Sequence, residues 1–427
     1  MDEGTEVDVW GFLVVLAGCG GDVSLNGEPG GPRAPTEAPE AVGGFDVEGA
    51  EPPEDVGPNF EKPKAVPTWR AEVPDGTDVT ISDRFFAPGR IHEFHLSLPA
   101  GSATKLAERD WVSATFSAEE EDYPVKVRLK GTTSFRDLTG KAAFRIDFAE
   151  EDPTARFHAL KRLTLNNMMQ DSSMLHEHVA YWLYRHRGVP APRHTFARLW
   201  VDGTYFGLYG VVETADEQFV NRVFPEDNNG NLYEANVSDF YTWKTDHFEL
   251  EETDDILPAY EDLYEVIAKI DAASVEDYTR VLGEIFDLDL LMRMWAIELV
   301  TTNVDGYAMF ANNYLLYHGE EKWYMLPWGH DQCLEWYRDV DDFSEIEGRL
   351  LLRCREAPEC DAMLNQAMLD LVDDWETSEM LAFTEAATAL VDPLCVADPR
   401  AEKVCDTEHV ARFVRDRPAT VRERVSP

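Results

Sequence analysis

The side chains best suited to chemistry in this sequence gather in one stretch, residues 303–331. Asp305 lies in a glycine-containing turn after a long apolar helical pattern, and Asn312 and Asn313 open an aromatic-rich strand. A second strand ends shortly before Asp331, so these oxygen-bearing side chains fall near the ends of one predicted hairpin. Carboxylate and amide oxygens suit a hard divalent metal ion, and a carboxylate beside such an ion suits metal-assisted phosphoryl transfer. The same residue types cap turns in most proteins, and on spacing alone that is the more frequent role.

A second stretch, residues 130–141, is rich in glycine, hydroxyl and basic residues and lies between two predicted strands. Its turn is followed by Arg136 and Lys141. Backbone N–H groups and cationic side chains in such a turn can bind phosphate. Composition alone favours the simpler interpretation, an ordinary hairpin with solvated basic side chains.

Together these stretches resemble the CotH kinase family, the spore-coat-protein-H-like atypical protein kinases. That family carries an N-x-D segment, an asparagine that opens a tyrosine-rich strand, and then W-x-x-x-P-W-D-x-D. This chain has N-V-D ending at Asp305, an asparagine and tyrosine beginning at Asn313, and W-Y-M-L-P-W-G-H-D ending at Asp331. One position departs from the pattern, because Gly329 stands where the family has the first aspartate of W-D-x-D.

Two further segments are similar to the family's motifs. The family pattern G-x-Y-x-G-x-Y-x-x-x-E-x-x-D begins here at Gly203 and includes Glu213 and Asp216. The resemblance extends from about residue 80 to the C-terminus. The family pattern G-x-S-x-R, a lysine and then an F-x-I-x-F strand corresponds to Gly131, Ser134, Arg136, Lys141, Phe144, Ile146 and Phe148.

The resemblance implies an α+β, protein-kinase-like, two-lobed fold. We expect a β-rich small lobe with one main helix over residues 68–222 and a helical large lobe over residues 223–427. Period-2 alternation from residue 85 to 98 and in several later segments predicts the strands of the small lobe. Helical periodicity dominates after residue 256 and fits the large lobe.

The resemblance also implies an activity, the transfer of the ATP γ-phosphate to a protein hydroxyl. Asp305 would orient or deprotonate that hydroxyl, and Asn313 and Asp331 would hold Mg²⁺ or Mn²⁺. Because Gly329 replaces a family aspartate, an alternative remains open. In that alternative the chain is a cell-surface binding or structural protein with a degenerate, inactive kinase-like fold.

For the nucleotide, the resemblance implies that Arg136 and Lys141 bind the phosphates and that Glu213 lies near the pocket. Glu177, on a helix predicted to follow an N-cap at residues 171–173 and to run to Arg187, would pair with Lys141. From the residues alone, Glu177 is equally well an exposed helix glutamate, and Glu213 a turn residue.

The charge balance limits the classes of partner that this protein could bind. The chain has 82 acidic and 38 basic residues among 427, a net charge of −44, so nucleic acid is a poor partner. A basic or serine-rich protein substrate fits better. A nucleotide pocket must invert the local potential, and six cations within twenty residues offer this: Lys126, Arg128, Lys130, Arg136, Lys141 and Arg145. Alternation along the strand places the first three on one face.

The first 19 residues contain a short apolar run that ends in L-A-G-C at Cys19, the form of a bacterial lipoprotein signal. The residues before it carry no lysine or arginine, so either the natural chain begins upstream or this N-terminus is inert. We expect the first, because residues 20–67 have the proline, glycine and glutamate content of a disordered tether. The expected location is therefore extracytoplasmic, with a lipid on Cys19 as the membrane anchor.

Cysteine spacing agrees with export. Cys354 and Cys360 form one close pair and Cys395 and Cys405 another, which suits short disulfides in an oxidising compartment. A metal site is the weaker alternative, because the chain has no C-x₂-C pair. Cys333 is left as a buried free thiol.

Overall fold

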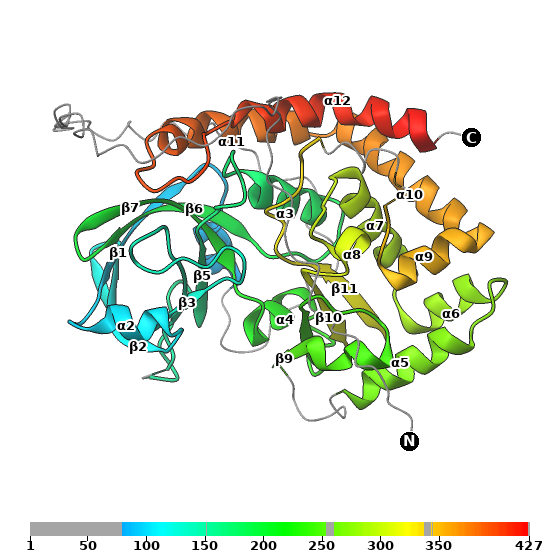
Figure 1. The fold of residues 1–427 in the computed structure, drawn as a ribbon, viewed down its shortest axis with the longest axis horizontal. Helices are drawn as coiled ribbons and strands as arrows, with labels where there is room; N and C mark the ends of the chain where they lie inside the picture. Colours follow the sequence, from blue (N-terminus) through cyan, green and yellow to red (C-terminus); the bar gives the residue numbers. More distant parts are fainter. Residues whose placement is uncertain (1–78, 151, 253–259, 337–342, 344, 426–427) are drawn as a thin grey trace, which may run out of the picture. The chain divides into compact units, whose positions relative to one another are not determined.

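The computed structural model confirms an α+β protein (Figure 1). The described residues fall within one compact unit. The predicted signal segment (1–19) and tether (20–67) lie outside them. None of the helices in the described part of the chain is both long and apolar enough to cross a bilayer. The structure describes residues 79–150, 152–252, 260–336, 343 and 345–425.

The N-terminal part is a closed barrel with the strand order β1-β2-β3-β4-β5-β7-β6. Neighbouring strands of the barrel pair antiparallel, except β1 and β6, which pair parallel. The strands are β1 (Ile91–Ser97), β2 (Val112–Ala118), β3 (Glu121–Lys130), β4 (Ala143–Asp147), β5 (Arg162–Asn166), β6 (His194–Val201) and β7 (Thr204–Glu213). The predicted strand over 85–98 is wrong at its start, because helix α1 (Val79–Phe85) precedes β1. A second short helix, α2 (Ser102–Ala107), follows β1.

Side-chain alternation along β3 sorts apolar from basic residues. Val125, Val127 and Leu129 are buried in the barrel core. The three cations predicted to share a face therefore lie together on the opposite face of the strand: Lys126, Arg128 and Lys130.

Helix α3 (His176–His186) follows β5 and is the main helix predicted from the sequence. Asp171 holds the turn before the helix: Oδ1 accepts the N–H of Ser173 at 2.7 Å, and Oδ2 accepts the N–H of His176 at 2.7 Å. The N-cap predicted at residues 171–173 is wrong by a few residues, because the helix begins at His176 and its N-cap is Leu175. Gly188, with φ +73°, ends the helix in the left-handed conformation that glycine tolerates.

A 4-stranded antiparallel sheet follows the barrel, with the order β11-β10-β8-β9. The hairpin predicted from the motif stretch is confirmed as β10 (Tyr314–His318) and β11 (Trp323–Pro327). Its partners β8 (Asn231–Ala235) and β9 (Phe248–Glu252) were not predicted. The part predicted as a helical lobe over residues 223–427 therefore contains a sheet of four strands rather than the hairpin alone, since the hairpin needs a sheet to cover its unpaired edge.

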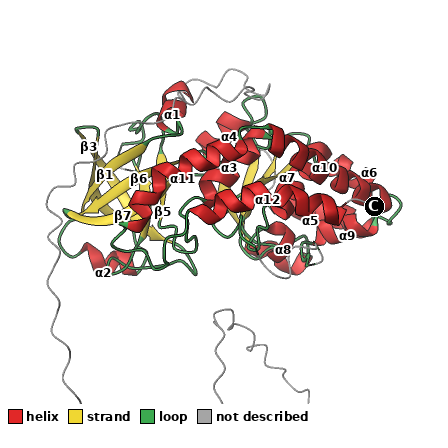
Figure 2. Ribbon diagram, turned by 90° about the horizontal axis from the view of Figure 1, so that it is seen from above, coloured by secondary structure: helices red, strands yellow, loops and turns green. Residues whose placement is uncertain are grey.

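Among the helices of this part, α7 packs against α10 and β11 and is buried almost all round. Near the C-terminus, α11 contacts β7 and α3, and α12 packs on α10 and α11 (Figures 1 and 2). The bounds are α4 (Glu217–Val223), the 3₁₀ helix η1 (Thr242–His247), α5 (Glu261–Ala272), α6 (Tyr278–Ile285), α7 (Leu288–Val300), α8 (Tyr307–Phe310), α9 (Arg349–Glu356), α10 (Pro358–Thr377), α11 (Met380–Val396) and α12 (Glu408–Val425).

Candidate active site

The turn that carries Asp305 is held from within the core by Glu298, near the end of α7. The Glu298 carboxylate accepts the N–H groups of Tyr307 at 3.1 Å and Ala308 at 2.9 Å. Burial raises the pKa of Glu298 to about 7, although these N–H groups and Asn303 oppose the shift. The buried glutamate therefore fixes the backbone of the turn that contains Asp305.

Asp305 itself is oriented by three side-chain amides. Its Oδ1 accepts a hydrogen bond from Asn312 at 3.0 Å, and its Oδ2 accepts from Asn313 at 2.8 Å and from Gln332 at 2.9 Å. A carboxylate has about four lone-pair sites, so one site on Oδ1 is left for a proton or a ligand. Burial raises the pKa of Asp305, and the three amides partly offset that increase. Such a carboxylate is held in one orientation and is more basic than a solvated aspartate.

Asp331 follows β11 and points its carboxylate toward the same region. The residue before it, His330, is buried and bonds the hydroxyl of Tyr184 at 2.8 Å, which fixes the loop. Within the described ranges, no residue donates a hydrogen bond to the Asp331 carboxylate. Burial and the negative charges of Glu177 and Asp305 raise its pKa well above the usual range. An unpartnered carboxylate among other acids is a natural ligand for a cation.

Glu177, on α3, faces Lys130, at the end of β3. Its carboxylate accepts hydrogen bonds from Asn166 Nδ2 at 2.6 Å and from the Tyr181 hydroxyl at 3.2 Å. Burial raises the pKa of Glu177, and the ammonium of Lys130 opposes this. Burial lowers the pKa of Lys130, and Glu177 in turn opposes that shift. The two groups are therefore electrostatic partners within the site.

Lys141 does not make the pairing that we expected with Glu177. Its Nζ donates to Asp398 Oδ2 at 2.7 Å, in a loop that follows α11. The N–H of Leu208 donates to the same oxygen at 2.9 Å. The predicted pairing of Lys141 with Glu177 is wrong, because β3 rather than the turn after it brings a lysine to α3.

Arg136 and Glu213 are also engaged elsewhere. Arg136 forms a two-point ion pair with Glu402 at 2.7 and 2.8 Å. Glu213 is buried between Arg193 and Arg222, each within 2.6 Å of one of its oxygens. Burial alone would raise the pKa of Glu213, but these two guanidinium groups lower it to about 2. The structure thus brings Asp305, Asn313, Asp331 and Glu177 together, and it gives Arg136, Lys141 and Glu213 ion-pair partners outside that group.

The glycine that departs from the family pattern lies against this group. Gly329 has φ +59°, and a Cβ added there would lie 3.0 Å from Cγ of Asn313. A side chain at this position would therefore crowd Asn313 unless the asparagine moved. Glycine leaves Asn313 room to donate to Asp305.

The donor set fits a hard divalent cation. Asn313 uses its amide N–H₂ on Asp305, and within the described part of the chain no group donates to its Oδ1. That oxygen and the Asp331 carboxylate are the kind of ligands that Mg²⁺ and Mn²⁺ prefer. The surplus of negative charge from Glu177, Asp305 and Asp331 over Lys130 would be neutralised by such an ion.

Sequence reasoning missed two contributors, Asn166 and Gln332. It placed Lys130 among the cations of the pocket, through alternation along β3, but did not predict that Lys130 would be the lysine near Glu177. Asn166 and Gln332 carried no signal, because a single amide at a strand end or in a loop usually serves the backbone.

Comparison with known sequences gives the class of this protein. The sequence model of one family, described as "CotH kinase protein", matches residues 127–371, which is more than half of the chain. The chain therefore belongs to the CotH kinase family. A kinase family in general implies ATP and a divalent metal ion.

Among individual proteins, the chain is similar to the inner spore coat protein H of Bacillus subtilis (strain 168). The two are 24% identical over 264 residues, which cover 58% of this chain and 70% of that protein. A weaker match among solved structures is a Shewanella oneidensis MR-1 complex of the toxin–antitoxin proteins HipA and HipB with operator DNA. It is 12% identical, has a TM-score of 0.28, and covers 66% of this chain and 58% of that chain, so it carries no argument about this fold.

Proposed function

We propose that this protein is a metal-dependent protein kinase that transfers the γ-phosphoryl group of ATP to a protein hydroxyl. The observation that carries the proposal is that Asp331 lies among the charges of Glu177, Asp305 and Lys130. These residues come from four separate segments of the chain. A carboxylate oriented by amides, an unpartnered carboxylate and a lysine near a glutamate are the parts that phosphoryl transfer requires.

In this reaction the acceptor oxygen bonds to the γ-phosphorus, and the bond from that phosphorus to the leaving oxygen of ADP breaks. Asp305 accepts the acceptor's proton through the lone pair left on Oδ1. The amides of Asn312, Asn313 and Gln332 keep the carboxylate in place. Lys130 binds phosphate oxygens, and Glu177 orients its ammonium.

Asn313 and Asp331 would hold the divalent ion, which supplies positive charge to the phosphates when it is bound. The two residues come from the ends of one hairpin, so β10 and β11 fix their separation. Both residues would thus have the metal-binding role that the resemblance implied.

We also propose that the protein acts outside the cytoplasm. Two disulfides, Cys354–Cys360 and Cys395–Cys405, support an oxidising compartment. A lipid on Cys19 would provide the anchor. With a net charge of −44, the surface favours a basic or serine-rich protein as the substrate.

A second candidate, a binding or structural protein without activity, is favoured by one observation. Gly329 supplies no carboxylate where the family pattern has one. In that case the acidic group would bind a cation without supporting transfer.

A phosphotransfer assay on the full-length chain tests the proposal. It uses labelled ATP, Mn²⁺ or Mg²⁺, and a basic, serine-rich protein as the acceptor. We expect transfer by the parent and a loss of about 10²- to 10⁴-fold in Asp305→Asn, with nucleotide affinity nearly unchanged. Lys130→Ala should weaken binding of a fluorescent ATP analogue by about 10- to 100-fold, because a charged hydrogen bond is lost.

Lys126→Ala is the matched control, since Lys126 shares a strand and a face with Lys130 but donates to Ser113 at 2.8 Å. It should bind the analogue as the parent does. A folded parent that transfers nothing to any acceptor or to itself would favour the binding protein. Equal loss of nucleotide binding in Asp305→Asn and Lys130→Ala would overturn the assigned roles.

A further inference from the structure

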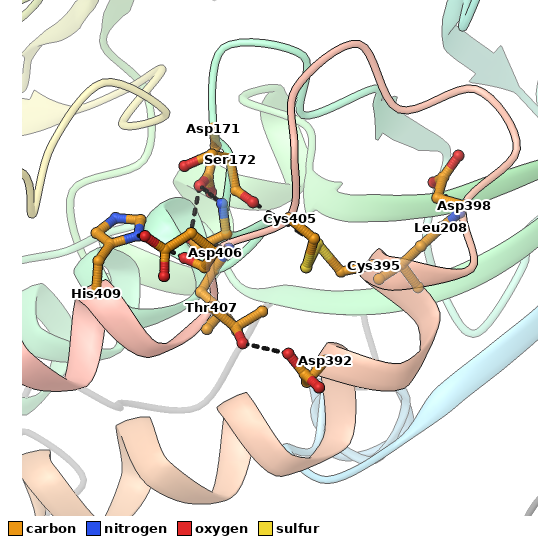
Figure 3. The surroundings of a disulfide bond; sticks show 12 residues. Asp171, Ser172, Leu208, Asp392, Cys395, Asp398, Cys405, Asp406, Thr407 and His409 are labelled. Carbon is orange, nitrogen blue, oxygen red and sulfur yellow. Dashed lines mark hydrogen bonds and ion pairs between the residues drawn. A yellow bond between two sulfur atoms is a disulfide. The ribbon is translucent and has the colours of Figure 1, made fainter.

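Two histidines from distant parts of the chain meet beside the candidate active site. His176 is the first residue of α3, and His409 lies in the first turn of α12. Their Nε2 atoms are 3.1 Å apart, and their ring planes are nearly perpendicular, at 85°. Figure 3 shows His409 beside Asp406 and close to Asp171, next to the loop closed by the Cys395–Cys405 disulfide.

The hydrogen bonds of the two rings fix where their lone pairs point. His176 Nδ1 is 2.8 Å from the carbonyl oxygen of Asp331, and His409 Nδ1 is 2.5 Å from the carbonyl oxygen of Asp406. A carbonyl oxygen only accepts, so each Nδ1 must carry the hydrogen. In a neutral imidazole the other nitrogen, Nε2, then bears a lone pair. Two lone pairs therefore face each other at 3.1 Å, an arrangement that requires a cation between them.

Glu335 completes a set of three ligands. Its Oε1 is 3.9 Å from His176 Nε2 and 4.0 Å from His409 Nε2, and the three ligand atoms lie within 4.8 Å of one another. With metal–nitrogen bonds of about 2.0–2.1 Å, two ligands on a tetrahedral zinc lie about 3.3 Å apart. The observed spacing is close to that value for the histidines and slightly open for the carboxylate.

The surroundings also suit a metal ion. His176 is fully buried, whereas the side chains of His409 and Glu335 are 16% and 27% exposed, so one side is open to solvent. Asp171 Oδ1, 3.4 Å from His176 Nε2, adds negative charge. The Nδ1–H to carbonyl bonds are the second contacts that metal-binding histidines usually make to fix their orientation.

We propose that His176, His409 and Glu335 bind Zn²⁺, with a fourth position left to water. Two imidazoles and one carboxylate favour zinc over Mg²⁺, in contrast to the oxygen ligands of the active site. The ion would join the starts of α3 and α12 to the loop after β11. Because His176 precedes Glu177 and holds the carbonyl of Asp331, the zinc would position both residues without contacting the nucleotide.

The test uses the full-length, tag-free chain, loaded with Zn²⁺ and then dialysed against buffer that contains Mg²⁺. Elemental analysis should find about one zinc per chain. His409→Gln and Glu335→Gln should lower zinc affinity by more than about 100-fold, since losing a residue that merely orients a ligand already costs about 10- to 100-fold. Cobalt loaded in place of zinc should give the strong visible absorption of a four-coordinate site in the parent but not in these variants.

Two controls separate this site from others. His186→Gln changes a histidine of the same helix that bonds Asp374 at 3.0 Å, and it should keep the zinc. Asp331→Asn removes a proposed nucleotide-site ligand but keeps the carbonyl that His176 uses, so it should also keep the zinc. The proposal is overturned if the parent retains less than about 0.1 zinc per chain, because a shared proton would then explain the histidine pair. It is equally overturned if His409→Gln retains the zinc or Asp331→Asn loses it. These readouts are independent of kinase activity.

Discussion

Lys141 Nζ lies 2.7 Å from Asp398 Oδ2, and the two side chains are 1% and 0% exposed. This buried ion pair joins the turn after β3 to the loop after α11, across 257 residues of sequence. Lys141 is the family-motif lysine, so its role here includes holding the C-terminal segment on the barrel.

Lys141→Ala should therefore destabilise the fold. It leaves Asp398 buried without a counter-charge, which typically costs about 3–5 kcal/mol. Arg136→Ala breaks the exposed pair with Glu402 and should cost less than about 1 kcal/mol. Urea unfolding of the parent and both variants measures the difference. Equal and small losses of unfolding free energy in the two variants would mean that the buried pair contributes little to stability.

The pH dependence of transfer should report on Asp305. A base must be deprotonated, so kcat/KM should fall as the pH drops through the pKa of Asp305, which burial raises. Asn312→Ala removes a donor that stabilises the anion, and the acid limb should move up by about half to one pH unit. Asn365→Ala, on α10, is the control and should leave the limb in place. An unmoved limb in Asn312→Ala would exclude Asp305 as the titrating base.

Glu298 should make stability depend on pH. Its folded pKa of about 7 lies above the usual 4.5, so the folded state binds the extra proton. The stabilisation is fully present below about pH 4.5 and is lost as the pH rises through 7, by on the order of 3 kcal/mol. Relative to the parent, Glu298→Gln should show a flatter dependence between pH 5 and 8 in urea unfolding.

Glu276→Gln, at an exposed position before α6, controls for the removal of one negative charge from a strongly acidic protein. Its stability should follow the parent's pH dependence. If the stability of Glu298→Gln also follows the parent's pH dependence, the buried glutamate is not the source of that dependence.

Both disulfides should stabilise the protein, and the one at Cys405 should also support the Lys141–Asp398 contact. The short loops predict roughly 2–3 kcal/mol for each bond on the chain-entropy model. Cys405→Ser should lower the urea midpoint accordingly. Alkylation of unfolded, non-reduced chain should label Cys333 and none of the four bonded cysteines. Labelling of all four would contradict the structure.

Local pattern was sufficient for much of this protein. The β10–β11 hairpin, helix α3 and the inward and outward faces of β3 follow from periodicity, turn residues and caps, which act over a few residues. Both disulfides and the buried thiol followed from cysteine spacing, because short loops close easily. Asp305 and Asn313 could be placed together for the same reason, since eight residues and one turn separate them.

The partners of the charged residues were decided only by the tertiary structure. With 82 acids and 38 bases, every cation has many candidate partners, and sequence distance says nothing about which one it meets. In the folded chain Lys130 rather than Lys141 lies near Glu177. The C-terminal segment brings Asp398 to Lys141 and His409 to His176. These contacts join residues that are far apart in the sequence, so they form only when the whole chain has folded.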